Sequence, residues 1–174
     1  MATNYIILPL NGATLPDASG STNDPAVPVI RVSGGTQTAN TPKVTWFEWQ
    51  FASSQDQHVM WTFRIPGDYS TGGTLRFKWK PDAASTSLCI WKAAVAVSTD
   101  GGGTDQNPTF SAIAVVCSTV GVAFQLAEKS IALTMTNAGA NDRMTLMFGN
   151  FPSTATYTTC SKVFLTDAIF EYTP

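Results

Sequence analysis

Strict alternation of large apolar and polar side chains, in two neighbouring stretches of chain, is the feature that most constrains the fold. In the first stretch every second residue is large and apolar: Val59, Trp61, Phe63 and Ile65. In the second stretch the apolar residues are Leu75, Phe77 and Trp79. The residues between and after them are basic: Arg76, Lys78 and Lys80. A period of two places successive side chains on opposite faces of a β-strand, so we predict an antiparallel sheet with one buried face.

Other segments of similar length show strand-like patterns and are separated by turn-forming Gly, Asn, Asp and Pro. The segments expected to form strands are 27–32, 44–51, 58–65, 75–80, 88–98, 110–119, 122–126, 130–136, 143–148 and 162–172. No segment has a convincing amphipathic helical period. We therefore predict an all-β fold, a sandwich or a barrel, and two packed antiparallel sheets are the commonest solution at this size.

The composition of the chain changes near residue 43. Residues 1–43 are dense in Gly, Pro, Ser, Thr, Asn and Asp, and within them only 27–32 is expected to form a strand. We predict that 1–43 is an extended N-terminal arm and that 44–174 is the β-sandwich domain. Such an arm cannot build a core alone, so it would gain order on a neighbouring molecule; the alternative is an ordinary loop-rich first strand.

The low charge content excludes several classes of function. Charged residues are 13% of the chain, about half of the ~25% that is typical. Ten Lys and Arg against twelve Asp and Glu give a net charge of −2, which supplies no field for holding nucleic acid. No apolar run approaches the roughly 18 residues that span a membrane. The first residues also lack the basic region of a signal peptide, so we expect use without export.

The cysteines fit neither a disulfide framework nor a zinc site. Cys89, Cys117 and Cys160 are odd in number, far apart and without a Cys-x-x-Cys pair. Cys89 and Cys117 lie in apolar runs, where a thiol behaves as a small hydrophobic group. We predict buried thiols.

The sequence offers little for catalysis. His58 is the only histidine and lies on the strand face opposite Trp61, where a solvent-facing or packing role is expected. Among the acids, only Glu48 and Glu171 lie inside predicted strands rich in aromatic residues. A glycosidase would need two acids close together in a cleft. We predict no catalytic residue, and therefore that the protein is not an enzyme.

Loop 100–107 contains several oxygen-bearing side chains, which are the ligands that calcium prefers. It lacks the alternating Asp spacing and the closing Glu of an EF-hand. A bent connection is the favoured interpretation and calcium the alternative, and we predict no cofactor.

Binding residues are sought among the aromatic and basic side chains. Trp49, Trp61 and Trp79 fall on apolar strand faces, which predicts core packing. Trp46 shares a face with Glu48, so we expect its ring to be exposed or covered by a partner. The basic row on 75–80 is expected to meet an acidic partner or to form a solvated face that discourages edge pairing. The candidate partner-binding residues are Trp46, Tyr69, Arg76, Lys78 and Lys80.

Segment 61–79 resembles the jelly-roll structural proteins of tailed bacteriophages. In both, an aromatic strand ends in Ile-Pro-x-x-Tyr, here at 65–69, a glycine follows, and the next strand carries alternating large residues. Runs 91–97 and 168–172 are similar to the middle and last strands of that group, so the likeness spans about 46–173. The resemblance implies an all-β fold, an antiparallel β-sandwich of jelly-roll type with about 8–10 strands. It also implies a virion protein, such as a capsid decoration or cement protein, and carries over no catalytic residue.

We therefore expect a non-enzymatic decoration protein that binds the major capsid protein or other virion proteins as a homo-oligomer. It would be located in the virion after assembly in the host cytoplasm, with neither nucleic acid nor membrane as a partner. Few charges suit a subunit that buries much of its surface. One alternative is a carbohydrate-binding module of β-sandwich fold, with Trp46 and Tyr69 or Tyr157 as the sugar platform. The other is a phage tail or receptor-binding domain, although no heptad repeats are present.

Overall fold

A computed structural model describes residues 2–16, 24–32, 44–99, 109–111, 113–120, 122–154 and 161–174. The strands are β1 (Asn4–Ile7), β2 (Asp24–Pro25), β3 (Val27–Val32), β4 (Thr45–Phe51), β5 (Gln57–Arg64), β6 (Thr71–Pro81), β7 (Ser85–Ser98), β8 (Ala114–Val120), β9 (Ala127–Ala132), β10 (Arg143–Asn150) and β11 (Val163–Thr173). Two short 3-10 helices are η1 (Leu10–Gly12) and η2 (Pro152–Thr154). Within these ranges, no helix has the length and apolar character needed to cross a membrane.

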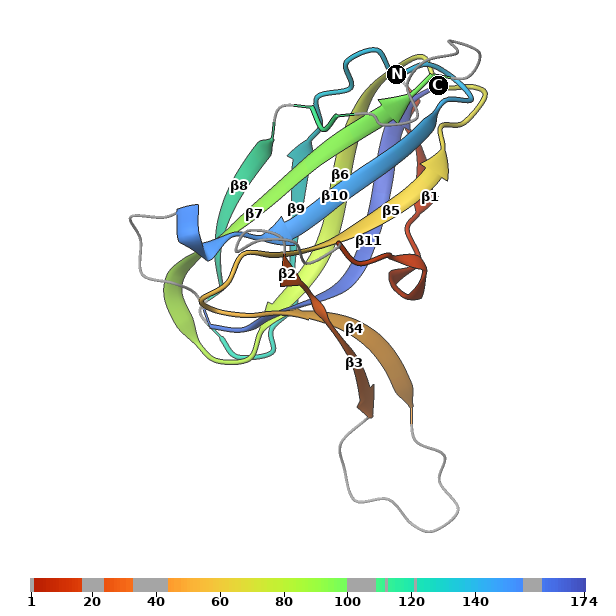
Figure 1. Cartoon of the computed structure of the whole chain (residues 1–174). Helices are drawn as coiled ribbons and strands as arrows, with labels where there is room; N and C mark the ends of the chain where they lie inside the picture. Colours follow the sequence, from red (N-terminus) through yellow and green to blue (C-terminus); the bar gives the residue numbers. More distant parts are fainter. Residues whose placement is uncertain are drawn as a thin grey trace.

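The strands form two packed sheets (Figure 1). Sheet A has the order β3-β4-β11-β6-β9, with β1 also paired to β11, and sheet B has the order β2-β5-β10-β7-β8. Without β1, β2 and β3, the orders 4-11-6-9 and 5-10-7-8 are those of an eight-stranded jelly roll. The predicted fold class is therefore confirmed.

Most predicted strands are present, but the segment 122–126 is not one of them. It is a turn that leads into β9, which begins earlier than expected. Phe124 adopts a left-handed conformation with φ of 58°, and its N–H donates to the Pro81 carbonyl at 2.8 Å. The apolar residues of this turn imitate a strand in sequence, while the backbone reverses direction.

The N-terminal segment differs from the single-strand arm that its composition predicts. Its described residues contain three strands, and each pairs with the sandwich: β1 with β11, β2 with β5 and β3 with β4. Two buried indoles also hold η1, since Trp49 donates to the Leu10 carbonyl at 2.7 Å and Trp61 to the Pro9 carbonyl at 3.0 Å. These strands depend on distant partners, which local composition does not reveal.

Aromatic rings fill the space between the sheets. Trp91 of β7 is stacked on Phe148 of β10, with ring centroids 5.1 Å apart, and contacts Phe77 and Trp79 of β6 edge-on. The predicted burial of the other core tryptophans is confirmed: Trp49, Trp61 and Trp79. Cys89 is buried as predicted, whereas the side chain of Cys117 and all of Cys160 lie outside the described residues.

Candidate functional site

Strand pairing determines which side chains share the solvent-facing side of sheet A, which we call the outer face. Core residues such as Trp49, Phe77 and Phe170 point inward, so their neighbours in sequence point outward. Directly paired residues of antiparallel strands lie on the same face. The outer face thus gathers Tyr5, Ile7, Trp46, Glu48, Arg76, Lys78, Lys80, Glu128, Phe164, Asp167, Ile169 and Glu171.

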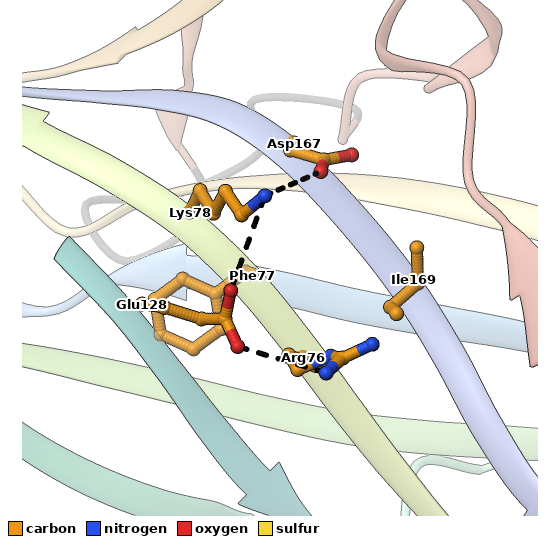
Figure 2. A pocket seen from close by; sticks show the side chains of 6 residues that line it. All are labelled: Arg76, Phe77, Lys78, Glu128, Asp167 and Ile169. Carbon is orange, nitrogen blue, oxygen red and sulfur yellow. Dashed lines mark ion pairs between the residues drawn. The ribbon is translucent and has the colours of Figure 1, made fainter. Parts of the chain in front are cut away.

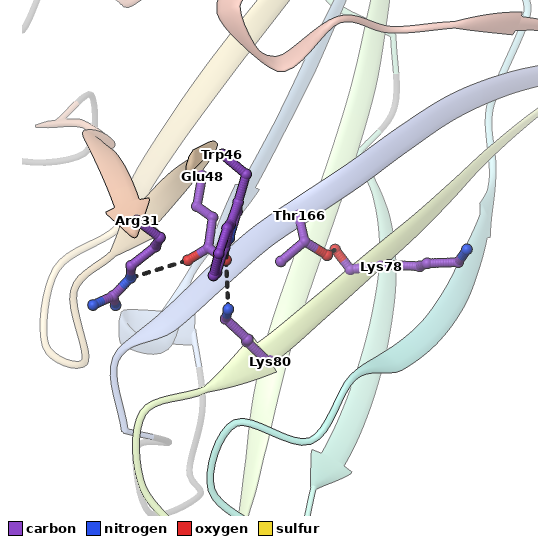
Figure 3. Close-up of polar contacts among 6 residues, drawn as sticks. All are labelled: Arg31, Trp46, Glu48, Lys78, Lys80 and Thr166. Atoms are coloured by element: carbon purple, nitrogen blue, oxygen red, sulfur yellow. Dashed lines mark hydrogen bonds and ion pairs between the residues drawn. The ribbon is translucent and has the colours of Figure 1, made fainter. Parts of the chain in front are cut away.

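A buried carboxylate anchors an exposed indole at the β4 end of this face (Figure 3). Glu48 is 0% exposed, and its Oε1 accepts a hydrogen bond from Trp46 Nε1 at 2.6 Å. Lys80 forms an ion pair with the same oxygen, and Arg31 Nε lies 3.2 Å from Oε2. We call Trp46, Glu48, Arg31 and Lys80 the Trp46 cluster. It compensates the buried charge with three donors, as a buried carboxylate requires.

The cluster fixes the Trp46 ring without covering it. Trp46 is 39% exposed, as its strand face predicted. The Lys80 ammonium lies 5.5 Å from the ring centroid, within the range of a cation–π contact. With the indole N–H held by Glu48, the ring is presented to solvent in one orientation.

The basic row of β6 is paired with acids from other strands (Figure 2). Arg76 contacts Glu171 of β11 at 2.9 Å and Glu128 of β9 at 3.7 Å. Lys78 lies 3.8 Å from Asp167 of β11 and 4.0 Å from Glu128. The acidic groups facing this row are therefore supplied by the chain itself. Sequence reasoning missed this because the acids lie far from β6 in sequence.

A small hollow of about 150 Å³ opens among these ion pairs. Its lining residues are Arg76, Phe77, Lys78, Glu128, Asp167 and Ile169. The hollow lies over three consecutive strands of sheet A, β11, β6 and β9. Strand β4, which carries Trp46, is the next strand after β11. The outer face therefore combines a fixed aromatic ring with a hollow lined by charged side chains.

The structure adds Tyr5 and Ile7 to this face. They pair with Glu171 and Ile169 of β11, and Tyr5 is 62% exposed. Strand β1 is only four residues long, so its alternation is too short to be recognised in the sequence. A second exposed ring therefore lies on the same face as Trp46.

Tyr69 does not join the other candidate residues. It packs against the core, with its ring centroid 6.1 Å from that of Tyr172, and burial raises the pKa of its phenol. Tyr157 and the 100–107 loop lie outside the described residues. The partner-binding role of Trp46, Arg76, Lys78 and Lys80 stays a prediction.

The described residues contain no arrangement suited to acid–base catalysis by Glu48 and Glu171. Trp49 pairs with Leu165, and Glu48, one residue before Trp49, lies one position nearer to Glu171, so about five residues of β11 separate the two acids. At about 3.3 Å per residue the two positions are roughly 16 Å apart, beyond the ~5–9.5 Å of glycosidase pairs. No three His, Cys, Asp or Glu residues in the described part of the chain are placed to hold a metal ion.

His58 is a buried packing residue, which is one of the two roles that the sequence predicted for it. It is 4% exposed and stacked on Phe151, with ring centroids 6.2 Å apart. Burial lowers the pKa of its imidazole below the usual 6.5. The folded protein therefore holds this side chain neutral at a pH where the unfolded chain binds a proton.

This difference predicts acid lability. The stability supplied by neutral His58 is fully present above pH 6.5 and is lost as pH falls from 6.5 towards the lowered pKa. The added slope is at most about 1.4 kcal/mol per pH unit, the limit for one proton. Urea unfolding at several pH values between 7.5 and 5 should show this slope in the wild type and not in His58→Gln. Equal slopes in the two proteins would contradict the assignment.

The comparisons with known proteins place the chain in no family. No protein-family model and no curated protein matches the chain. Among solved structures, a mannohexaose complex of CBM27-1 from Caldicellulosiruptor saccharolyticus is similar at 13% identity and a TM-score of 0.40, covering 95% of this chain and 96% of that one. A carbohydrate-binding module specific for non-crystalline cellulose, CBM28, is similar at 11% identity and a TM-score of 0.41, covering 80% of this chain and 78% of that one. The K3 adhesin domain of Lys-gingipain from Porphyromonas gingivalis is similar at 14% identity and a TM-score of 0.38, covering 95% of this chain and 90% of that one.

Proposed function

We propose that this protein is a non-enzymatic carbohydrate-binding domain that binds its ligand on the outer face of sheet A. The observation that carries the proposal is the Trp46 ring, which is 39% exposed while its N–H is fixed by a buried carboxylate. Trp46 is the stacking surface, and the charged groups beside it supply hydrogen bonds. Tyr5 of β1 provides a second ring on the same face.

The chemistry of sugars fits this combination. A pyranose presents C–H groups on its ring faces and hydroxyl groups around its rim, so it needs an apolar platform next to hydrogen-bonding groups. An indole offers a large apolar surface with few rotatable bonds. Since Glu48 and Lys80 already hold the ring, little conformational entropy is lost when a ligand stacks on it.

Substitution of Trp46 tests the proposal. Trp46→Ala is expected to weaken the binding of a neutral oligosaccharide at least about tenfold, because the stacking surface is lost. Trp46→Phe should keep part of the affinity. The probe is chosen by screening the wild type on a glycan array, and affinities are measured by titration calorimetry.

Phe124→Asn is the matched control for this experiment. Phe124 is also an exposed aromatic residue, it lies in the turn before β9, and Asn tolerates its left-handed backbone. Its affinity should equal that of the wild type. Absence of glycan binding, or unchanged affinity of Trp46→Ala, would overturn the proposal.

A second candidate function is the virion decoration role, with the major capsid protein as partner and the chain as a homo-oligomer. The observation that favours it is the ribbon formed by β3 and β4, which leaves the body of the sandwich (Figure 1). Ile30 on this ribbon is 73% exposed, and beside it an open hollow of about 420 Å³ includes Leu10 and Phe47. Exposed apolar patches often contact other proteins. Cosedimentation with capsids at a fixed copy number would support this role.

A further inference from the structure

We infer that the hollow next to the Trp46 cluster selects neutral sugar residues over acidic ones, by hydroxyl groups that bridge Lys78 to Asp167 and to Glu128. This inference rests on the proposed function and specifies the substrate class of the same face. It is carried by the lengths of the ion pairs and by the distribution of charge around the hollow.

The ion pairs around Lys78 leave space for a ligand atom. Lys78 Nζ lies 3.8 Å from Asp167 Oδ2 and 4.0 Å from Glu128 Oε2. Both distances exceed the 2.7–3.2 Å of an N–H···O hydrogen bond. By contrast, Arg76 and Glu171 are in direct contact at 2.9 Å. The ammonium and the two carboxylates thus attract each other but keep hydrogen-bonding capacity.

A hydroxyl group matches these three partners. It accepts a hydrogen bond from the Lys78 ammonium and donates one to Asp167 or Glu128, whose carboxylates are acceptors only. A carboxylate or sulfate accepts from Lys78 but has no proton for the acids. Ile169, which also lines the hollow, offers an apolar wall for the C–H groups of a sugar ring.

The charge around the hollow opposes an acidic ligand. The lining contains two cations, Arg76 and Lys78, and two acids, Glu128 and Asp167. Glu171 also pairs with Arg76, so acids outnumber cations once it is included. An anionic group placed in the hollow would approach these carboxylates at short range, and juxtaposed like charges are unfavourable.

The position of the hollow allows one ligand to contact both the hollow and the Trp46 ring. Strands β4, β11 and β6 are consecutive in sheet A, and neighbouring strands are about 4.8 Å apart. Thr166 of β11 lies between the Trp46 cluster and Lys78 in Figure 3. An oligosaccharide lying across the strands would stack one unit on Trp46 and place the next in the hollow.

The test compares hexasaccharides of equal length by titration calorimetry at low ionic strength. The neutral probes are cellohexaose, mannohexaose and xylohexaose, and the acidic probe is hexagalacturonate. We expect the best neutral probe to bind at least about tenfold tighter than hexagalacturonate. Asp167→Asn removes one carboxylate and keeps an oxygen acceptor, so it should narrow this ratio severalfold.

The control is Asp24→Asn, which makes the same change in net charge on β2 of sheet B. It should leave the ratio unchanged. Equal or tighter binding of hexagalacturonate, or an unchanged ratio in Asp167→Asn, would overturn the inference. If those results occur while Trp46→Ala still weakens the binding of a neutral oligosaccharide, the proposed function stands and only this inference fails. If no glycan binds at all, both fail.

Discussion

Trp91→Ala is expected to lower the free energy of unfolding by about 3–5 kcal/mol, the cost of removing a large buried aromatic side chain. Trp91 is fully buried and contacts rings from both sheets, among them Phe51, Phe77 and Phe148. Its removal leaves a cavity between sheets A and B that neighbouring strands cannot close. Guanidinium unfolding followed by circular dichroism measures the change.

Two further variants separate packing from other effects of losing an indole. Trp46→Ala removes the same side chain from the surface. It takes one of three donors from Glu48 but opens no cavity between the sheets, so it should cost less stability than Trp91→Ala. Trp91→Phe should cost less than Trp91→Ala, because a phenyl ring fills much of the cavity that Ala leaves. Neither variant loses a hydrogen bond, since Trp91 Nε1 has no partner among the described residues. Equal stability losses at positions 46 and 91 would contradict the placement of Trp91 at the centre of the core.

Gly149→Ala is expected to cost about 3 kcal/mol or more, because the added methyl group collides with a neighbouring backbone. A Cβ at position 149 would lie 2.1 Å from the Gln57 carbonyl oxygen and 2.8 Å from His58 Cα. Both atoms belong to β5, which pairs with β10 at this point. The two strands would have to separate to make room, since a backbone cannot rotate away as a side chain does.

Gly67→Ala provides the matched control for Gly149→Ala. There the nearest atom to an added Cβ is Asn141 Oδ1 at 3.5 Å, an ordinary contact. Its stability should stay within about 0.5 kcal/mol of the wild type. A melting temperature of Gly149→Ala equal to that of Gly67→Ala would show that β5 and β10 are not paired in this register.

Local alternation was sufficient to predict β5 and β6 and the faces they bury. A period of two depends only on strand geometry, so Trp61, Phe77 and Trp79 could be placed in the core from the sequence alone. The exposure of Trp46 followed in the same way from its polar neighbours on β4. The jelly-roll fold that the phage resemblance implied is confirmed by the strand order, whereas the virion role stays a prediction.

Features that depend on distant pairing could not be predicted in this way. Glu48 appears in the sequence as one acid on a strand, and only the fold brings Arg31 and Lys80 to it. The acids that face Lys78 come from β9 and β11. Strands β1 and β2 are short and gain their hydrogen bonds from β11 and β5. The outer face is therefore a product of tertiary structure.

The central claim is that Trp46 contacts a carbohydrate, and the indole N–H signals of the protein test it most directly. The chain has five tryptophans, and four of them are buried in the core: Trp49, Trp61, Trp79 and Trp91. Nuclear magnetic resonance of the ¹⁵N-labelled protein, titrated with the best neutral hexasaccharide, should shift the Trp46 indole signal strongly and the other four little. Binding that leaves the Trp46 signal in place, or no binding at saturating ligand, would contradict the account.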